Sequence, residues 1–199
     1  MASLSPSQLH IKVCDDPDLL SHERLVYTWL GPHPRIVKCL NPSLWSLPVD
    51  TRIKASETEP LSFPKAPHGD LEQYLKAHPD VPARLRIKWA RQIAEGIAFI
   101  HSRRIAWADC TPANLLLDAN LDILLCDFGG SGIDGARSRV ILPGRYCDPH
   151  VDYSSDYLCG PKVDIFAFGC VFLEILTYNE ADTVDYESTL HRGAPGRRR

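Results

Sequence analysis

Two carboxylates and one carboxamide are spaced along the middle of the chain in a pattern that could bind a metal ion. Asp109 and Asn114 are five residues apart, and Asp127 follows further along. The set contains no His or Cys, so its oxygen donors suit a hard cation such as Mg²⁺, which shares its remaining positions with water and phosphate oxygens. The pattern therefore predicts a site that handles phosphate with the help of a metal ion.

Two short apolar runs predict the β-hairpin that must bring these residues together. Leu115–Leu117 and Ile123–Cys126 are separated by the polar turn Asp118–Asp122, which is a hairpin signal. The Asp109 and Asn114 pair precedes the first strand, and the second carboxylate follows the second strand. Because the open ends of a hairpin lie side by side, we expect the three side chains to converge on one point.

Helical patterns lie on both sides of the hairpin. Residues 81–102 carry the longest, with apolar side chains at three- and four-residue spacings. Residues 162–177 are apolar on nearly all sides and predict a buried helix. Asp70 opens a short helix over 71–76. Residues 129–160 predict a long ordered loop, and loops of that length are usually functional.

The N-terminal part predicts a smaller, strand-containing unit. His10–Val13 is typical of a short strand, and residues 18–30 of a helix that Ser21 could cap and that Gly31 and the following proline end. Ile36–Leu40 predicts another short strand. A proline-rich connector then leads into the helical part of the chain.

The spacing of the site residues resembles that of the eukaryotic protein kinase family. That family has a catalytic-loop Asp, four residues, an Asn, and then Asp-Phe-Gly, and this chain has Asp109, Asn114 and Asp127–Gly129. The segment Asp164–Gly169 also falls in family order. The resemblance covers roughly residues 10 to 180. The sequences of segments 126–131 and 164–170 are most similar to those of fungal kinase-like proteins.

The resemblance implies an α+β, protein-kinase-like bilobal fold. It divides the chain into a partial, β-rich N-lobe with the hinge over residues 1–67 and a partial, mainly helical C-lobe over 68–183. The C-lobe would hold the catalytic loop, the activation segment and the buried helix. Residues 184–199 would form a disordered tail.

The resemblance also implies roles for the three site residues. Asp109 would orient the acceptor hydroxyl and take its proton, while Asn114 and Asp127 would hold Mg²⁺ on the phosphates of ATP. Asp164 would hold the backbone N–H groups of the catalytic loop. Trp107, where the family has His, would fill the apolar slot under Phe128.

The remaining nucleotide contacts fall on the N-lobe and hinge in the family pattern. Lys12 would hold the α- and β-phosphates, with Glu23 as its ion-pair partner; the alternative is that both are solvated surface charges. Adenine would be gripped by the backbone carbonyl of Pro64 and the backbone N–H of Ala66, with Leu116 beneath it. Here too the alternative is a plain proline-rich connector.

Several residues depart from the family pattern. No glycine-rich loop precedes Lys12, and the late C-lobe helices do not follow, so we expect a chain truncated at both ends. Ala108 occupies the position where the family has an Arg that binds a phosphate on the activation segment. Thr111 stands where serine/threonine kinases usually have Lys, and His150 where they have Glu.

These observations support two main hypotheses. The first is a protein kinase that uses ATP and Mg²⁺ to phosphorylate Ser or Thr hydroxyls of a protein. The alternative is a pseudokinase or interaction module with little or no turnover. A third reading, a small-molecule phosphotransferase, shares the Asp, four residues, Asn spacing, but the Asp-Phe-Gly sequence argues against it.

Composition limits the partners and the compartment. The 199 residues are 44% hydrophobic and 24% charged, which excludes a wholly disordered or collagen-like chain. A formal net charge of -3 gives no general attraction to nucleic acid or to an anionic membrane. Seven scattered cysteines and no signal-peptide pattern favour a reducing compartment. We therefore expect a cytoplasmic or nuclear protein that has a protein substrate or partner and binds neither nucleic acid nor a membrane.

Overall fold

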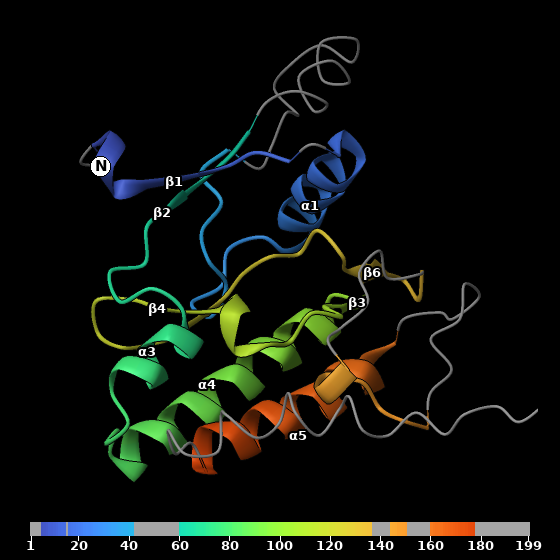
Figure 1. Ribbon diagram of the computed structural model, residues 1–199. Helices are drawn as coiled ribbons and strands as arrows, with labels where there is room; N and C mark the ends of the chain where they lie inside the picture. The colour runs from blue at the N-terminus through green and yellow to red at the C-terminus, as the bar shows by residue number, and fades with distance from the viewer. Residues whose placement is uncertain (1–4, 15, 42–59, 137–143, 151–159, 178–199) are drawn as a thin grey trace, which may run out of the picture.

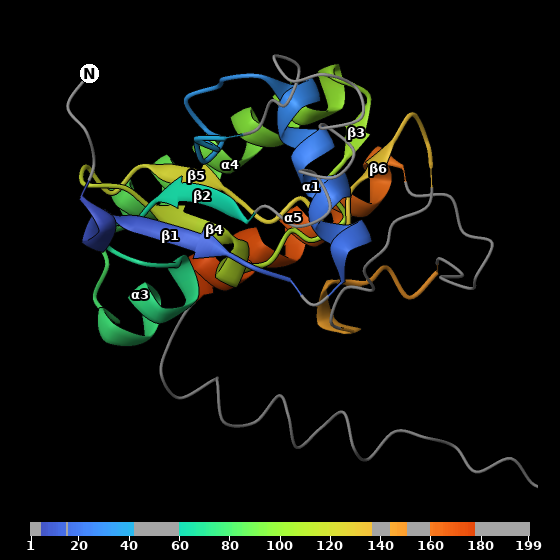
Figure 2. The same ribbon diagram turned by 90° about the horizontal axis from the view of Figure 1, so that it is seen from above.

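The N-terminal strands and the C-terminal helices occupy opposite sides of the molecule. The computed structural model describes residues 5–14, 16–41, 60–136, 144–150 and 160–177. Strands β1 and β2 and helix α1 lie on one side, helices α3, α4 and α5 on the other, and β4 between them (Figure 1). Seen from above, β1 and β2 lie over β4 and β5, with α1 beside them (Figure 2). Within the described ranges, no helix has the length and hydrophobicity needed to cross a bilayer.

The N-terminal side contains one antiparallel strand pair and one long helix. After a 3-10 turn, η1 (Pro6–Gln8), strand β1 (Leu9–Lys12) pairs with β2 (Leu61–Pro64), so that Lys12 lies opposite Leu61. Helix α1 (Pro17–Leu30) follows β1. These elements place a lysine at the end of a strand that leads directly into the helix.

The start of helix α1 differs from the sequence-based expectation. Ser21 does not cap the helix; the side chain of Asp16 accepts hydrogen bonds from the backbone N–H groups of Asp18 and Leu19. Pro17 at the first helical position needs no N–H partner, so the helix begins there. Gly31 ends it as expected, with a φ of 69° that favours glycine.

The C-terminal side is mainly helical. Helices α3 (Leu71–Ala77), α4 (Ala83–Ser102) and α5 (Pro161–Thr177) are close to the predicted spans, and α4 packs against α5. The side chain of Asp70 caps α3, as its position predicts. The other short elements are two 3-10 turns and two strands that pair with each other. The turns are η2 (Pro112–Asn114) and η3 (Gly144–Tyr146), and the strands are β3 (Ile105–Ala106) and β6 (Gly132–Ile133).

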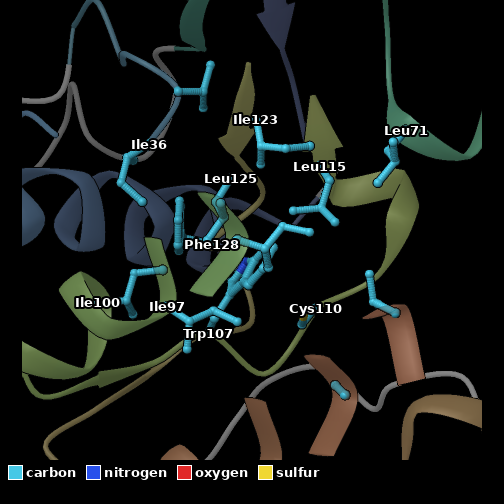
Figure 3. Packing of buried hydrophobic residues seen from close by; sticks show 14 of the residues in the cluster. Ile36, Leu71, Ile97, Ile100, Trp107, Cys110, Leu115, Ile123, Leu125 and Phe128 are labelled. Atoms are coloured by element: carbon cyan, nitrogen blue, oxygen red, sulfur yellow. The ribbon is translucent and has the colours of Figure 1, made fainter. Parts of the chain in front are cut away.

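The predicted hairpin is present. Strand β4 (Leu115–Leu117) pairs antiparallel with β5 (Ile123–Leu125), and Leu115 lies opposite Leu125. The core around this hairpin includes Trp107 and Phe128 from the segments on either side of it, together with Ile97 and Ile100 of α4 (Figure 3). The residues that precede and follow the hairpin are thus anchored by large buried rings.

Two other sequence-based expectations are wrong. Ile36–Leu40 is not a strand: Ile36 makes a single bridge to Leu125, whose backbone N–H and carbonyl bond to Arg35 and Val37. Helix α5 is not buried on all sides, because Ile165 and Leu173 remain 59% and 61% exposed. The loop predicted over 129–160 lies partly outside the described residues, and the part of it that the structure describes contains β6 and η3. The predicted tail, 184–199, lies wholly outside the described residues.

Candidate active site

Lys12 connects the two sides of the molecule. Its Nζ lies 2.7 Å from Glu23 Oε2 on α1 and 2.8 Å from Asp127 Oδ1, which follows the hairpin. The Glu23 side chain is only 2% exposed and that of Lys12 26%. The two residues are therefore a partly buried ion pair and not independent surface charges.

Burial and charge act against each other in this group. Burial lowers the pKa of Lys12, but the carboxylates of Glu23 and Asp127 outweigh it, so that the pKa is raised from its ordinary value. Burial raises the pKa of Glu23, and Lys12 opposes that shift. Lys12 is thus charged at neutral pH, and its charge is what makes the buried position of Glu23 tolerable.

The backbone of Asp127 is held in an unusual conformation. Its φ is 56°, in the left-handed region that few non-glycine residues adopt. The Trp107 indole N–H donates to the carbonyl oxygens of both Cys126 and Asp127, each at 3.0 Å. On the other side, the backbone N–H of Phe128 donates to Glu23 Oε1 at 3.2 Å. These bonds fix the direction in which the Asp127 carboxylate leaves the chain.

Asp109 and Asn114 meet in the loop before the hairpin. Asn114 Nδ2 donates to the backbone carbonyl of Asp109 at 3.0 Å, and Asn114 O accepts from the backbone N–H of Cys126 at 3.1 Å. Asn114 is thus bonded both to Asp109 and to the neighbour of Asp127. The convergence that the hairpin predicts is present in the structure.

The ionisation of Asp109 is strongly perturbed. Burial, reinforced by the nearby Asp127 carboxylate, raises its pKa from 3.8 to about 6, while Asn114 and Lys12 oppose the shift. A carboxyl group with this pKa is deprotonated at neutral pH and is a better proton acceptor than an ordinary aspartate.

The donor set fits a magnesium ion that is shared with a ligand. Asn114 and Asp127 offer one amide oxygen and one carboxylate, and Mg²⁺ is commonly bound by one or two carboxylates plus phosphates and water. Across the described ranges, no cluster of three or more His, Cys, Asp or Glu side chains could hold a metal ion. With two donors from the chain, the other positions around such an ion are left for phosphate oxygens and water.

Asp164 of α5 holds the loop that leads to Asp109, as the family resemblance implies. Its Oδ2 accepts from the backbone N–H of Trp107 at 2.8 Å, and its Oδ1 from that of Ala108 at 2.7 Å. His101 Nε2 lies 2.8 Å from Asp164 Oδ2, a contact that sequence reasoning missed. The Trp107 ring packs against Phe128, 5.9 Å between centroids, also as predicted.

The segment predicted to grip adenine lies between the two sides of the molecule. Pro64 ends β2, and Ala66 O accepts from the backbone N–H of Gly69. Among the described residues, no backbone bond outside the strands and helices uses the N–H of Ala66. Leu116 is half-buried on β4 and bridges to Asp70. A role for Pro64, Ala66 and Leu116 in nucleotide binding stays a prediction.

Two contacts of the site have no recognisable sequence signal. His22, next to Glu23 on α1, lies 2.7 Å from the carbonyl oxygen of Ser131. The hydroxyl of Ser131 donates to the carbonyl oxygen of Trp107 at 3.1 Å. Neither residue type marks a site by itself, and more than 100 residues separate His22 from its partner along the chain.

Known proteins resemble the chain over most of its length. A family model described as "Protein kinase domain" matches residues 16–191. A protein of Dictyostelium discoideum named "Probable serine/threonine-protein kinase" is 35% identical over 132 residues, which are 60% of this chain and 31% of the relative. One of the same description from Arabidopsis thaliana is 37% identical over 118 residues, 56% of this chain and 28% of the relative.

A third relative covers more of the chain. It is named "Probable receptor-like protein kinase", comes from Arabidopsis thaliana, and is 30% identical over 183 residues, 82% of this chain and 50% of the relative. The chain thus spans half or less of the length of each of these relatives.

Proposed function

The chain belongs to the protein kinase family, and we propose that it transfers the γ-phosphoryl group of ATP to a Ser or Thr hydroxyl of a protein substrate. The α+β fold and the serine/threonine kinase relatives support the general class of reaction. The use of ATP and Mg²⁺, the identity of the base and the activity of this chain are parts of the proposal.

The contact of Lys12 with both Glu23 and Asp127 carries the proposal. A lysine ammonium has three N–H donors, and these two carboxylates take two of them. The third is available for a phosphate oxygen of the nucleotide. Glu23 thereby orients the cation, and Asp127 links the phosphate position to the metal position.

Asn114 and Asp127 are the residues that would hold Mg²⁺, an ion that neutralises phosphate charge when it is bound. Their backbones are tied together through Cys126. Phosphoryl transfer needs mainly positioning and charge neutralisation from the protein. The chain's own contribution is a rigid placement of these donors relative to Lys12.

Asp109 is the proposed base. As the substrate hydroxyl oxygen bonds to the γ-phosphorus and the bond to ADP breaks, the hydroxyl proton passes to the Asp109 carboxylate. The raised pKa of about 6 matches this role, because the group is ionised at neutral pH and still accepts a proton. Asn114 contacts Asp109 and so orients the loop that carries it.

The hinge residues complete the proposed nucleotide site. The carbonyl of Pro64 would accept from the adenine amino group, the N–H of Ala66 would donate to the ring, and Leu116 would pack beneath it. Leu116 and Asp70 form a bridge that joins this part of the hinge to the hairpin. Leu116 of β4 and the open ends of the hairpin would therefore contribute to both the proposed adenine position and the proposed metal position.

A thermal-shift titration with ATP, with and without Mg²⁺, tests binding first. A ligand at 100 times its Kd should add about 2.7 kcal/mol to the free energy of unfolding. Radiolabel transfer to a protein acceptor then tests turnover, with Asp109→Asn and Asp127→Asn as inactive controls. Mg²⁺-dependent binding without transfer would favour the interaction-module alternative, and a cooperative melt with no shift would contradict the nucleotide site.

A further inference from the structure

Ser131 is a buried junction of three segments. It is 0% exposed. Its N–H donates to the carbonyl oxygen of Phe128 at 3.1 Å, its hydroxyl donates to that of Trp107 at 3.1 Å, and its own carbonyl oxygen faces His22 Nε2 at 2.7 Å. Ser131 therefore bonds the turn after Asp127, the catalytic loop and helix α1 to one another.

The contact with His22 has a defined direction. The Ser131 oxygen is a carbonyl and can only accept, so His22 Nε2 carries the proton and donates it. A neutral imidazole protonated at Nε2 and an imidazolium both satisfy this bond. The contact thus needs a donor at this position of the side chain, and it does not need a positive charge.

Two neighbouring residues of α1 hold the two ends of the same turn. Glu23 accepts from the N–H of Phe128, directly after Asp127, and His22 donates to Ser131 at the far end. Figure 2 shows α1 lying beside the hairpin and β6, where this turn runs. A displacement of α1 therefore pulls on both ends of the segment that begins with Asp127.

The turn is also fixed from the catalytic loop. Trp107 donates its indole N–H to the carbonyl oxygen of Asp127 and accepts at its own carbonyl from Ser131. Asp127 needs this support because its φ of 56° is costly for a residue with a side chain. Strained backbone persists only where surrounding contacts over-determine it.

From these contacts we propose that His22, acting through Ser131, is a positioning residue for Asp127. Its hydrogen bond ties α1 to the Asp127–Ser131 turn, so that Lys12–Glu23 pairing and the orientation of the Asp127 carboxylate are set together. The inference rests on the proposed function in one respect: Asp127 is taken to bind the metal. The contacts themselves do not depend on it.

Three variants separate the hydrogen bond from the volume of the side chain. His22→Leu removes the donor, and His22→Gln keeps an N–H donor at a similar reach. Ser131→Ala removes the hydrogen bond to Trp107 by the loss of a single oxygen atom. The change is small, so we expect this variant to fold. Leu25→Ala is the matched control, because Leu25 lies on the same helix with 46% of its surface exposed.

The first readout is amide hydrogen exchange without ligand. His22→Leu should speed exchange in α1 and in residues 128–133 and leave the middle of α4 unchanged, while His22→Gln and Leu25→Ala should match the wild type. Ser131→Ala should speed exchange in the same turn. Wild-type exchange of residues 128–133 in His22→Leu would overturn the proposal, whatever Ser131→Ala shows.

The second readout is the affinity for ATP with and without Mg²⁺. His22→Leu should weaken the Mg²⁺-dependent affinity about fivefold, the effect of one hydrogen bond, leave Mg²⁺-free affinity nearly unchanged, and be rescued by His22→Gln. Equal losses with and without Mg²⁺ would contradict a role for His22 in positioning Asp127. If the wild type binds no Mg²⁺–ATP, the proposed function fails, while the exchange experiment still decides whether His22 orders the turn.

Discussion

Asp164 Oδ1 accepts the backbone N–H of Ala108 at 2.7 Å, and Ala108 has a φ of 62°. The bond therefore fixes a residue in a conformation that alanine rarely adopts. Asp164 is 0% exposed and also accepts from Trp107 and contacts His101. One buried carboxylate thus sets the path of the chain into Asp109.

Replacing Asp164 should uncouple the loop from helix α5. Asp164→Ala leaves two buried backbone N–H groups without acceptors, and we expect a loss of about 3 kcal/mol in the free energy of unfolding. Asp164→Asn keeps one acceptor oxygen and should lose less. Urea denaturation measures both values. Equal stability of Asp164→Ala and the wild type would contradict the assignment.

Asp109 should cost stability where it is ionised. Its folded pKa, about 6, lies above its ordinary value of 3.8, so its favourable contribution is complete below about pH 4 and is lost as the pH rises through 6. Asp109→Asn cannot ionise. In the ligand-free protein it should therefore melt above the wild type at pH 8, and this advantage should vanish near pH 4.

Melting curves from pH 4 to pH 8 test this prediction, with Asp80→Asn as a control at an exposed aspartate. A gain in melting temperature for Asp109→Asn that is the same at every pH would speak against a raised pKa. Phosphoryl transfer should be lost in Asp109→Asn at all pH values, since the base is gone.

Removal of Lys12 should expose the cost of burying Glu23. Lys12→Met leaves a 2% exposed carboxylate without its cation, and we expect a loss of about 3 kcal/mol, the lower end for a broken buried pair because Lys12 is 26% exposed. Since burial raises the pKa of Glu23, the deficit should grow as the pH rises.

The double variant Lys12→Met with Glu23→Gln distinguishes stability from binding. It should recover most of the lost stability, because a neutral amide needs no cation, but it should not recover affinity for ATP. Thermal melts with and without nucleotide measure both effects. Recovery of binding in the double variant would show that Lys12 does not contact the phosphates.

Gly96 marks a close approach between α4 and the hairpin. A Cβ at this position would lie 2.8 Å from Leu125 Cδ1 and 3.3 Å from Arg35 Cβ. Gly96→Ala should therefore destabilise by about 1 kcal/mol, since overpacking exceeds the gain in helix propensity. Gly169→Ala on α5, where no atom of the described residues lies within 4 Å of the added Cβ, should instead stabilise. Chemical denaturation of both variants gives the comparison, and a stabilising Gly96→Ala would refute it.

Arg86 joins the start of α4 to the end of α5. This buried side chain donates to the carbonyl oxygens of Val81 and Pro79, each at 2.9 Å, and to that of Ile175. Arg86→Met keeps the apolar stem but leaves these acceptors unpaired, and should cost about 3 kcal/mol. Arg86→Lys should recover only part, because an ammonium cannot reproduce the guanidinium fork. A near-native denaturation midpoint for Arg86→Met would rule out this role.

Sequence patterns predicted the hairpin and the helices well because those signals are local. The periodicity of 81–102 and the capping position of Asp70 each describe a few neighbouring residues, and α4 and α3 follow them closely. The convergence of Asp109, Asn114 and Asp127 followed from the same hairpin. Fold and family were therefore within reach of the sequence.

The wrong predictions concern places where neighbouring residues offer similar alternatives for a helix cap, a strand or a buried helix face. Both Asp16 and Ser21 are good caps, and Pro17 decided in favour of the earlier one. Ile36–Leu40 has strand-forming residues, but its backbone bonds are divided between Leu125 of β5 and Ser62 of β2, so it forms no continuous ladder with either strand. The apolar faces of α5 look alike in sequence, and packing against α4, η3 and β3 decides which face is buried.

The contacts made by His22, Ser131 and His101 could not be predicted at all. Each joins a side chain to a backbone group or carboxylate far away in sequence, and none belongs to a periodic pattern. The Lys12–Glu23 pair was predicted only through the family resemblance. Spacing alone left solvated charges as an equal alternative.

The Lys12–Asp127 ion pair joins residues that are 115 positions apart. During synthesis at about 5–20 residues per second, Lys12 waits roughly 6–23 s for this partner, and β1 waits for β2, its partner among the described strands. Helix α1 can form early, but Glu23 then stays hydrated. The proposed nucleotide site is thus a late product of folding, completed only after the hairpin has been synthesised.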